Sequence, residues 1–268
     1  MNLYATLNDI KDLLVVEADN DEQLLRVLEA ASRQIEKLTG RYFYCYEGIK
    51  YLDGGGSKMW LSEDILSITT LKLDEDGDGV FESSLAPADY ILYPLNTYPK
   101  TRLEINPQGD YSGFNSGIQK GIQITGVFGY ADSQTPYELR TTLVGALAAA
   151  VTTVPSTDSS LLETGETIRI GSEQMFIEEI NANNLICKRE VNGTTAATHT
   201  TLDPIYAYTY PGDIVQATLI IAMRAWKRKD SAYQDIVGSP ETGQIITSKG
   251  IDPDVRELVA PYRRQEYF

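Results

Sequence analysis

The stretch between residues 213 and 229, DIVQATLIIAMRAWKRK, most constrains what this chain can fold into. Pro211 and Gly212 precede it as helix breakers, and Asp213 is followed three residues later by Gln216, the pattern of a capping box. Apolar side chains then recur at spacings of four, three and four residues, at Val215, Leu219, Ala222 and Trp226. This spacing predicts a helix with a broad apolar stripe that lies in a core.

The end of this helix is basic, although the chain as a whole is acidic, with a net charge of −15. Its last turns carry four cations, Arg224, Lys227, Arg228 and Lys229. They form either a solvated helix end that complements the helix dipole, or a docking face for an acidic partner or nucleic acid. The excess of acidic residues, 38 against 23 basic ones, argues against a protein that wraps DNA. It is compatible with a channel through which DNA slides.

Three further helices are predicted from capping patterns. Thr6 and Asp9 form a capping box for a short first helix, and a second helix runs from about residue 20 to a closing glycine at Gly40. A capping box at Thr135 and Glu138, with a proline between, predicts a third helix over residues 136–151. Its alanine-rich face suits close packing against the helix at 213–229.

Between the helices the hydrophobic period changes to two, which predicts strands. The first group is expected to form a small, mostly antiparallel sheet; its clearest members are residues 65–73, 90–93, 102–105 and 122–128. A Thr- and Asn-rich segment, residues 155–210, contains short strands separated by Gly and Asn turns, at residues 168–170, 175–180, 185–188 and 205–210. The expected fold class is therefore α+β: a helical bundle packed with a small antiparallel sheet, with an inserted small all-β domain and an extended C-terminal tail.

The sequence holds no recognisable catalytic pattern, so we expect a protein that is not an enzyme. The one histidine, His199, stands among threonines, and a turn or surface position is the expected one. Cys45 and Cys187 lack the spacing of a zinc or disulfide framework and are expected to be packed thiols. No apolar run is long enough to cross a bilayer, and the first residues lack a signal core, so we expect synthesis in the cytoplasm.

An acidic run at residues 74–79 matches part of a calcium-binding loop. Asp74, Asp76 and Asp78 match its first, third and fifth positions, and Glu82 its ninth. The twelfth position, where a glutamate belongs, is Leu85. The run is therefore either a weak calcium clip that includes all four carboxylates, or the solvated tip of an Asp-Gly hairpin.

Tyrosines and the C-terminus point to assembly. The chain has 17 tyrosines against six phenylalanines, and tyrosine is favoured at interfaces. Tyr206, Tyr208 and Tyr210 alternate, which suits an intersubunit contact or a ligand-binding face. The last eight residues, PYRRQEYF, carry aromatics and arginines but no core, so they are either disordered or anchored in another molecule.

Several of these stretches resemble the head–tail connector (adaptor) proteins of tailed bacteriophages. The resemblance lies in ATLNDIKDLL, DEQLLRVLEAASRQIEKLTGRYF, YLDGGGSKMWLSEDILSITTLKLDEDGDG, DIVQATLIIAMRAWKRKDSAYQD and VRELVAPYRR, and it covers residues 1–153 and 211–268. The segment REVNGTTAATH is similar to a β module that recurs in phage neck and tail proteins. The family pattern is shorter, so residues 155–210 depart from it.

The resemblance implies a ring, usually twelvefold, beneath the portal protein, which extends the DNA channel and offers a platform to the next neck or tail protein. It implies a connector core at residues 1–153 and 211–235, an inserted β module at 154–210 and a docking tail at 236–268. In the tail, the residues expected to contact the portal are Val255, Leu258, Tyr262, Arg263, Arg264, Tyr267 and Phe268. The expected location is the virion neck, after assembly in the host cytoplasm, with neighbouring copies as partners, genomic DNA in the lumen and no membrane. The alternative is a calcium-clipped module that binds a surface ligand through its inserted β domain.

Overall fold

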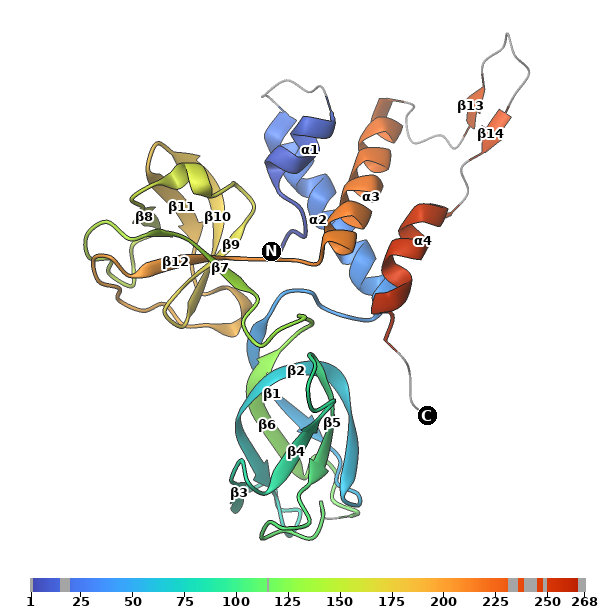
Figure 1. The fold of residues 1–268 in the computed structure, drawn as a ribbon, viewed down its shortest axis with the longest axis vertical. Helices are drawn as coiled ribbons and strands as arrows, with labels where there is room; N and C mark the ends of the chain where they lie inside the picture. Colours follow the sequence, from blue (N-terminus) through green and yellow to red (C-terminus); the bar gives the residue numbers. More distant parts are fainter. Residues whose placement is uncertain are drawn as a thin grey trace. The chain divides into compact units, whose positions relative to one another are not determined.

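The computed structural model describes residues 2–14, 20–114, 116–230, 236–238, 245–247 and 250–264. In this part of the chain lie two six-stranded antiparallel sheets, a two-stranded ladder and four α-helices (Figure 1). They belong to two compact units. Unit 1 contains Met1–Gly40, Glu138–Arg189 and Ala196–Arg264, and unit 2 contains Arg41–Tyr137 and Glu190–Thr195.

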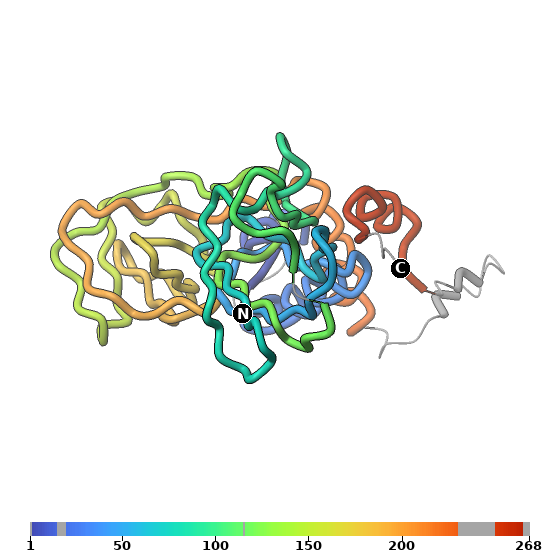
Figure 2. Tube along the Cα trace, turned by 90° about the horizontal axis from the view of Figure 1, so that it is seen from below, coloured from blue at the N-terminus to red at the C-terminus, as the bar shows by residue number. Residues whose placement is uncertain are grey.

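The helices of unit 1 come from the two ends of the chain. They are α1 (Leu7–Leu13), α2 (Asp21–Thr39), α3 (Gly212–Asp230) and α4 (Pro253–Val259). In Figures 1 and 2 the blue α2 and the orange α3 lie side by side, and α3 also packs against α4. The capping box at Thr6 and Asp9 is confirmed, as is the glycine end of α2, where Gly40 has a φ of 67°. The predicted helix over residues 213–229 is confirmed as α3.

The segment after residue 250 folds back on these helices. Asp252 accepts a hydrogen bond from Asp254 N and caps α4, and it forms an ion pair with Arg224 of α3 at 2.8 Å. Val255 and Val259 are fully buried, and a short 3₁₀ turn, η4 (Ala260–Tyr262), follows. Arg264 N then donates to Thr39 O of α2 at 2.8 Å. The prediction of an extended tail is therefore wrong for residues 253–262, because the apolar side chains of α4 are buried against its own chain.

Unit 2 is built on one sheet with strand order β1-β6-β2-β5-β4, and β3 pairs with β2. The strands are β1 (Tyr46–Leu52), β2 (Lys58–Leu73), β3 (Ser83–Leu85), β4 (Tyr90–Tyr93), β5 (Lys100–Ile105) and β6 (Ile122–Phe128). β6 lies between β1 and β2, so these two strands do not form a hairpin although they are consecutive in the sequence. The buried core side chains are Leu61, Ile65, Leu71, Leu73, Leu85, Leu103, Ile105, Phe114, Ile122, Ile124 and Phe128.

The second sheet belongs to unit 1 and has the order β7-β12-β9-β10-β11-β8. Its strands are β7 (Tyr137–Thr142), β8 (Thr153–Pro155), β9 (Thr167–Ile170), β10 (Glu173–Asn181), β11 (Asn184–Lys188) and β12 (Pro204–Tyr208); two 3₁₀ turns, η2 (Ser159–Leu161) and η3 (Val191–Gly193), lie between them in sequence. The predicted strands at 168–170, 175–180, 185–188 and 205–210 are confirmed as β9 to β12, although β12 ends two residues early. The third ladder joins β13 (Ile236–Gly238) to β14 (Ile245–Thr247).

The predicted helix over residues 136–151 is wrong. Residues 137–142 form β7, and Leu143 and Leu147, which fall within the predicted helix, are buried in the core of the second sheet. Backbone pairing decides the outcome, because Leu147 exchanges two hydrogen bonds of 2.9 Å with His199. Leu143 is bound in the same way to the segment at residues 202–203. Tertiary pairing thus outweighs the helix propensity of the alanines.

The expected fold class, a helical bundle packed with a small sheet, is also wrong. The described chain is mostly β, because the strands of 137–142 and 153–155 enlarge the second sheet to six and the first sheet also has six. The four helices form a minor cluster at the chain ends. The expected packed thiols are confirmed: Cys45 and Cys187 are buried and unbonded to each other.

Candidate functional site

The acidic loop lies in unit 2, between the end of β2 and the start of β3. Asp74 is buried at its base, and its carboxylate accepts backbone hydrogen bonds from Gly77 at 2.6 Å and Gly79 at 2.9 Å. Both glycines have positive φ angles, 85° and 89°, which let the backbone curl around the carboxylate. Burial raises the pKa of Asp74, but hydrogen bonds from the backbone of Gly77, Gly79, Asp76 and Asp78 together outweigh burial and hold the pKa below its ordinary value.

The other carboxylates of the loop converge on the same point. Asp76 and Asp78 each accept a hydrogen bond from the backbone two residues ahead, and Glu82 accepts one from Glu75 N. Asp74, Asp76, Asp78 and Glu82 each offer one oxygen, and these four oxygens all lie within 4.8 Å of one another. Oxygen-rich clusters of this kind suit hard cations. The cluster could hold a metal ion, and all four residues named from the sequence belong to it.

Leu85, at the twelfth position of the loop, cannot complete a calcium-binding loop. Its side chain is 5% exposed and belongs to the core of unit 2. The ligand set is therefore short of the bidentate glutamate that gives strong calcium loops their affinity. A calcium ion held by these four carboxylates alone would therefore be bound weakly, and hydrogen bonds within the loop already close it.

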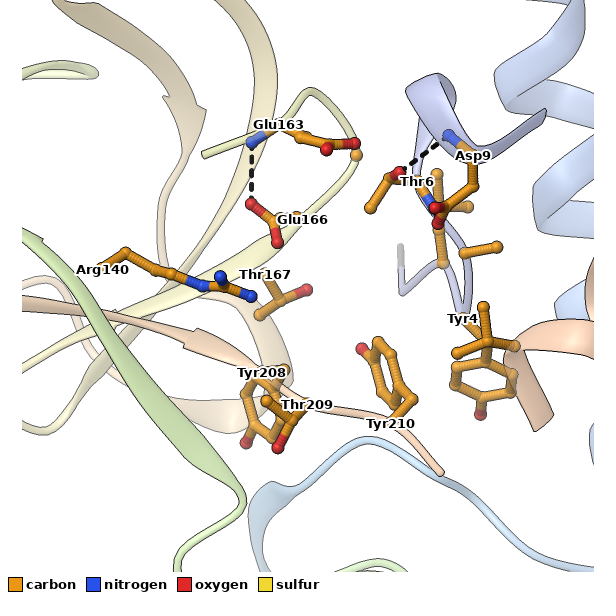
Figure 3. Close-up of a pocket in the computed structure, with 14 residues that line it drawn as sticks. Tyr4, Thr6, Asp9, Arg140, Glu163, Glu166, Thr167, Tyr208, Thr209 and Tyr210 are labelled. Atoms are coloured by element: carbon orange, nitrogen blue, oxygen red, sulfur yellow. Dashed lines mark hydrogen bonds between the residues drawn. The ribbon is translucent and has the colours of Figure 1, made fainter. Parts of the chain in front are cut away.

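Unit 1 contains a cavity of about 300 Å³ beside the first turn of α3 (Figure 3). It is lined by the N-terminal segment before and in α1, by β7, by the turn that leads into β9, and by the residues at and after the end of β12. Its charged side chains are Asp9, Arg140, Glu163 and Glu166. Tyr4, Tyr208 and Tyr210 form an aromatic side, with Tyr4 and Tyr210 in edge contact at 5.1 Å. We call this cavity the acidic pocket.

Glu166 is the most perturbed carboxyl of the acidic pocket. Burial raises its pKa to about 7, opposed by the hydrogen bond that Glu163 N donates to it at 2.7 Å and by the charge of Arg140. The negative charges of Glu163 and Asp9 act in the same direction as burial. Figure 3 shows both glutamates and Arg140 beside the cavity. The pocket thus combines three carboxyl groups with one guanidinium.

The tyrosines singled out in the sequence separate in the structure. Tyr208 is only 5% exposed, and its ring lies 6.2 Å from that of Tyr210 in a near-parallel arrangement. Both line the acidic pocket, whereas Tyr206 lies on β12 opposite Arg169 of β9 and does not line it. The face of exposed aromatic rings that a ligand-binding module needs is therefore not formed by these three side chains.

The residues expected to contact a portal differ in exposure. Val255 is fully buried on its own chain, Leu258 and Arg264 are half-buried, and Arg263 is exposed. Tyr262 is half-buried, and its hydroxyl lies 3.4 Å from Asp213 of α3. Tyr267 and Phe268 lie outside the described residues.

Sequence reasoning missed a buried ion-pair network in unit 1. Glu173 is fully buried and binds Arg189 through two hydrogen bonds, of 2.7 and 2.5 Å, and His199 Nε2 at 2.9 Å. Arg189 also donates to the carbonyls of Ala148 and Val151. The expectation of a turn or surface position for His199 is wrong, because its side chain is 5% exposed. These side chains hold the loops at residues 148–151 and 197 against the second sheet. The spacing of the three residues in the sequence does not indicate that they are in contact.

The sequence matches no model of a known protein family and no curated protein. Among the described helices, none is both long enough and apolar enough to cross a membrane.

Proposed function

We propose that this chain is a structural protein of a phage virion, a head–tail connector that assembles as a ring beneath the portal. The ring extends the DNA channel and offers a platform to the next neck or tail protein. One observation carries the proposal: the helical stretches that resemble connectors come from opposite ends of the sequence, yet α2, α3 and α4 pack into one cluster. The two ends of the chain thus share one helical cluster, which supports a core that is interrupted by the intervening β-strands.

The end of α4 supplies the proposed portal contact. Arg263 is exposed, and Leu258, Tyr262 and Arg264 are half-buried beside it, whereas Val255 serves the chain's own core. Aromatic and arginine side chains are the residue types that dominate interface energies. The ion pair between Arg224 and Asp252 holds α4 on α3, so the proposed contact residues lie on a segment that is fixed to the helical cluster.

Co-migration with the portal protein of the same virion tests this function. The full chain is mixed with the assembled portal and separated by size-exclusion chromatography. We expect the wild type to co-migrate, and the variant Arg263→Glu/Tyr267→Ala/Phe268→Ala to lose at least about tenfold in affinity, as the loss of several interface anchors does. Arg256→Glu is the matched control, since Arg256 is exposed on α4 outside the proposed contact. Failure of the wild type to co-migrate contradicts the proposal.

A second candidate function is favoured by the acidic loop. The four convergent oxygens support a calcium clip that ties the β2–β3 connection of a binding module. Because the loop lacks its twelfth-position glutamate, we expect a dissociation constant on the order of 10⁻³ M. Calorimetric titration with calcium should give heat that disappears in Asp76→Asn/Asp78→Asn. The absence of heat at millimolar calcium in the wild type removes the clip.

A further inference from the structure

Two charged features of unit 1 lie at opposite ends of α3. The acidic pocket is lined by Val215, in the first turn of the helix, and the cations Lys227, Arg228 and Lys229 are exposed in its last turn. A helix rises ~1.5 Å per residue, so Val215 and Lys227 are separated by roughly 18 Å along a rigid element. The two features therefore cannot meet within one copy.

The acidic pocket has the chemistry to receive a cation. Three carboxyl groups face a single guanidinium, and the buried Oε2 oxygen of Glu163 accepts no hydrogen bond among the described residues. Of the tyrosines that line the pocket, Tyr210 is half-buried, and a tyrosine ring attracts ammonium and guanidinium groups. A volume of about 300 Å³ is several times the ~30 Å³ share of one water, so a lysine or arginine side chain fits.

We propose that the acidic pocket of one copy receives the basic end of α3 from a neighbouring copy. The contact joins two different surfaces, so it is heterologous, and repetition of such a contact closes into a ring when the rotation allows it. The inference rests on the proposed ring and names the surfaces that join its subunits. Lys227 and Arg228 supply the cations, and Glu163 and Glu166 supply their acceptors.

A peptide titration tests the pocket without requiring a ring. The full chain is titrated with a peptide of residues 222–230, AMRAWKRKD, and with the same peptide carrying glutamine at positions 227, 228 and 229. We expect the basic peptide to bind at least about tenfold more tightly, and Glu163→Gln/Glu166→Gln to abolish the difference, as the loss of desolvated charge pairs does. Glu178→Gln/Glu179→Gln, two exposed carboxylates on β10, is the control with the same change in charge. Equal affinity for the two peptides overturns the proposal.

Complementing variants test the head-to-tail arrangement. Lys227→Gln/Arg228→Gln/Lys229→Gln removes the basic end, and the double glutamate variant removes the pocket. By sedimentation velocity, each variant alone should be a monomer, and their mixture should form dimers but nothing larger, because only one intact contact remains. Monomers in the mixture at concentrations where the peptide saturates the pocket overturn the proposal. If the peptide binds but portal-bound rings are never found, the proposed function is contradicted, whereas the proposed contact between pocket and basic end is supported. If rings persist in both variants, the proposed function is supported and the proposed contact is contradicted.

Discussion

At the scale of single residues, burial of an ionisable side chain lowers the stability of the folded state when that side chain is charged. Glu166 is the clearest case, because burial among other carboxyls raises its pKa to about 7 from an ordinary value of 4.5. The folded state therefore holds a proton on Glu166 at pH values where the unfolded state has lost it. Between these two values the stability of the fold decreases as pH rises, and above about 7 the full loss remains.

Glu166→Gln should remove this loss. We expect the variant to be more stable than the wild type at pH 8, by on the order of 1–3 kcal/mol, and equally stable at pH 4, where both side chains are neutral. Urea unfolding at the two pH values measures the difference. Glu178→Gln, at an exposed position of β10, should show no such pH dependence. A variant that is less stable at pH 8 would contradict the account of the pocket.

Gly126 of β6 is required by a close approach of two backbones. A Cβ atom at this position would lie 2.2 Å from the carbonyl oxygen of Ser67 in β2, where the register of the pair shifts. Gly126→Ala should therefore destabilise the protein by about 1–3 kcal/mol or more, as overpacking does. Thermal unfolding measures it. Gly55→Ala is the control, since a Cβ there meets nothing within 4 Å, and equal midpoints for the two variants would contradict the geometry.

At the scale of elements, the network of Glu173, Arg189 and His199 stabilises a non-helical conformation in the segment 136–151, for which the sequence predicts a helix. Arg189 binds the carbonyls of Ala148 and Val151, so that loop is shaped by partners from β10 and from the segment after β11. The pKa of Glu173 is below its ordinary value because hydrogen bonds from Arg189, Ala197 and His199 outweigh the larger single effect of burial. The carboxylate is thus charged and fully satisfied.

Glu173→Gln should leave Arg189 buried without its counter-charge. Removal of one partner from a buried ion pair costs about 3–5 kcal/mol, and we expect a loss of that order. Chemical denaturation measures it, with Glu22→Gln as the control, since the pair of Glu22 and Arg26 is exposed. A loss no greater than that of the control would show that the network does not hold the second sheet.

The predictability of each element follows the range of its interactions. α1, α2 and α3 are predicted from the sequence because caps such as Thr6 and Gly40 act within a few residues. β7 could not be predicted in this way, because its partner strand β12 lies more than sixty residues further along the sequence. In addition, Pro136 stands in a pattern that is typical of the start of a helix. The carboxylates of the acidic loop are predicted for the same reason that the helices are, since they lie within nine residues.

At the scale of the whole molecule, the acidic pocket is beyond sequence reasoning. Asp9, Arg140, Glu163 and Val215 come from four separate segments, and only the fold of unit 1 brings them together. The basic end of α3 is visible in the sequence, but its two interpretations could not be separated without a complementary surface. In the inference proposed above, the acidic pocket of a neighbouring copy is that surface.

Electron microscopy of the protein mixed with its portal tests the central claim most directly, namely that the chain is one of many identical copies in a connector. We predict end-on views with closed rotational symmetry, twelvefold if the proposed connector function holds, stacked on the portal and open along the axis. Single compact copies beside undecorated portals, under conditions where the portal itself is intact, would contradict it.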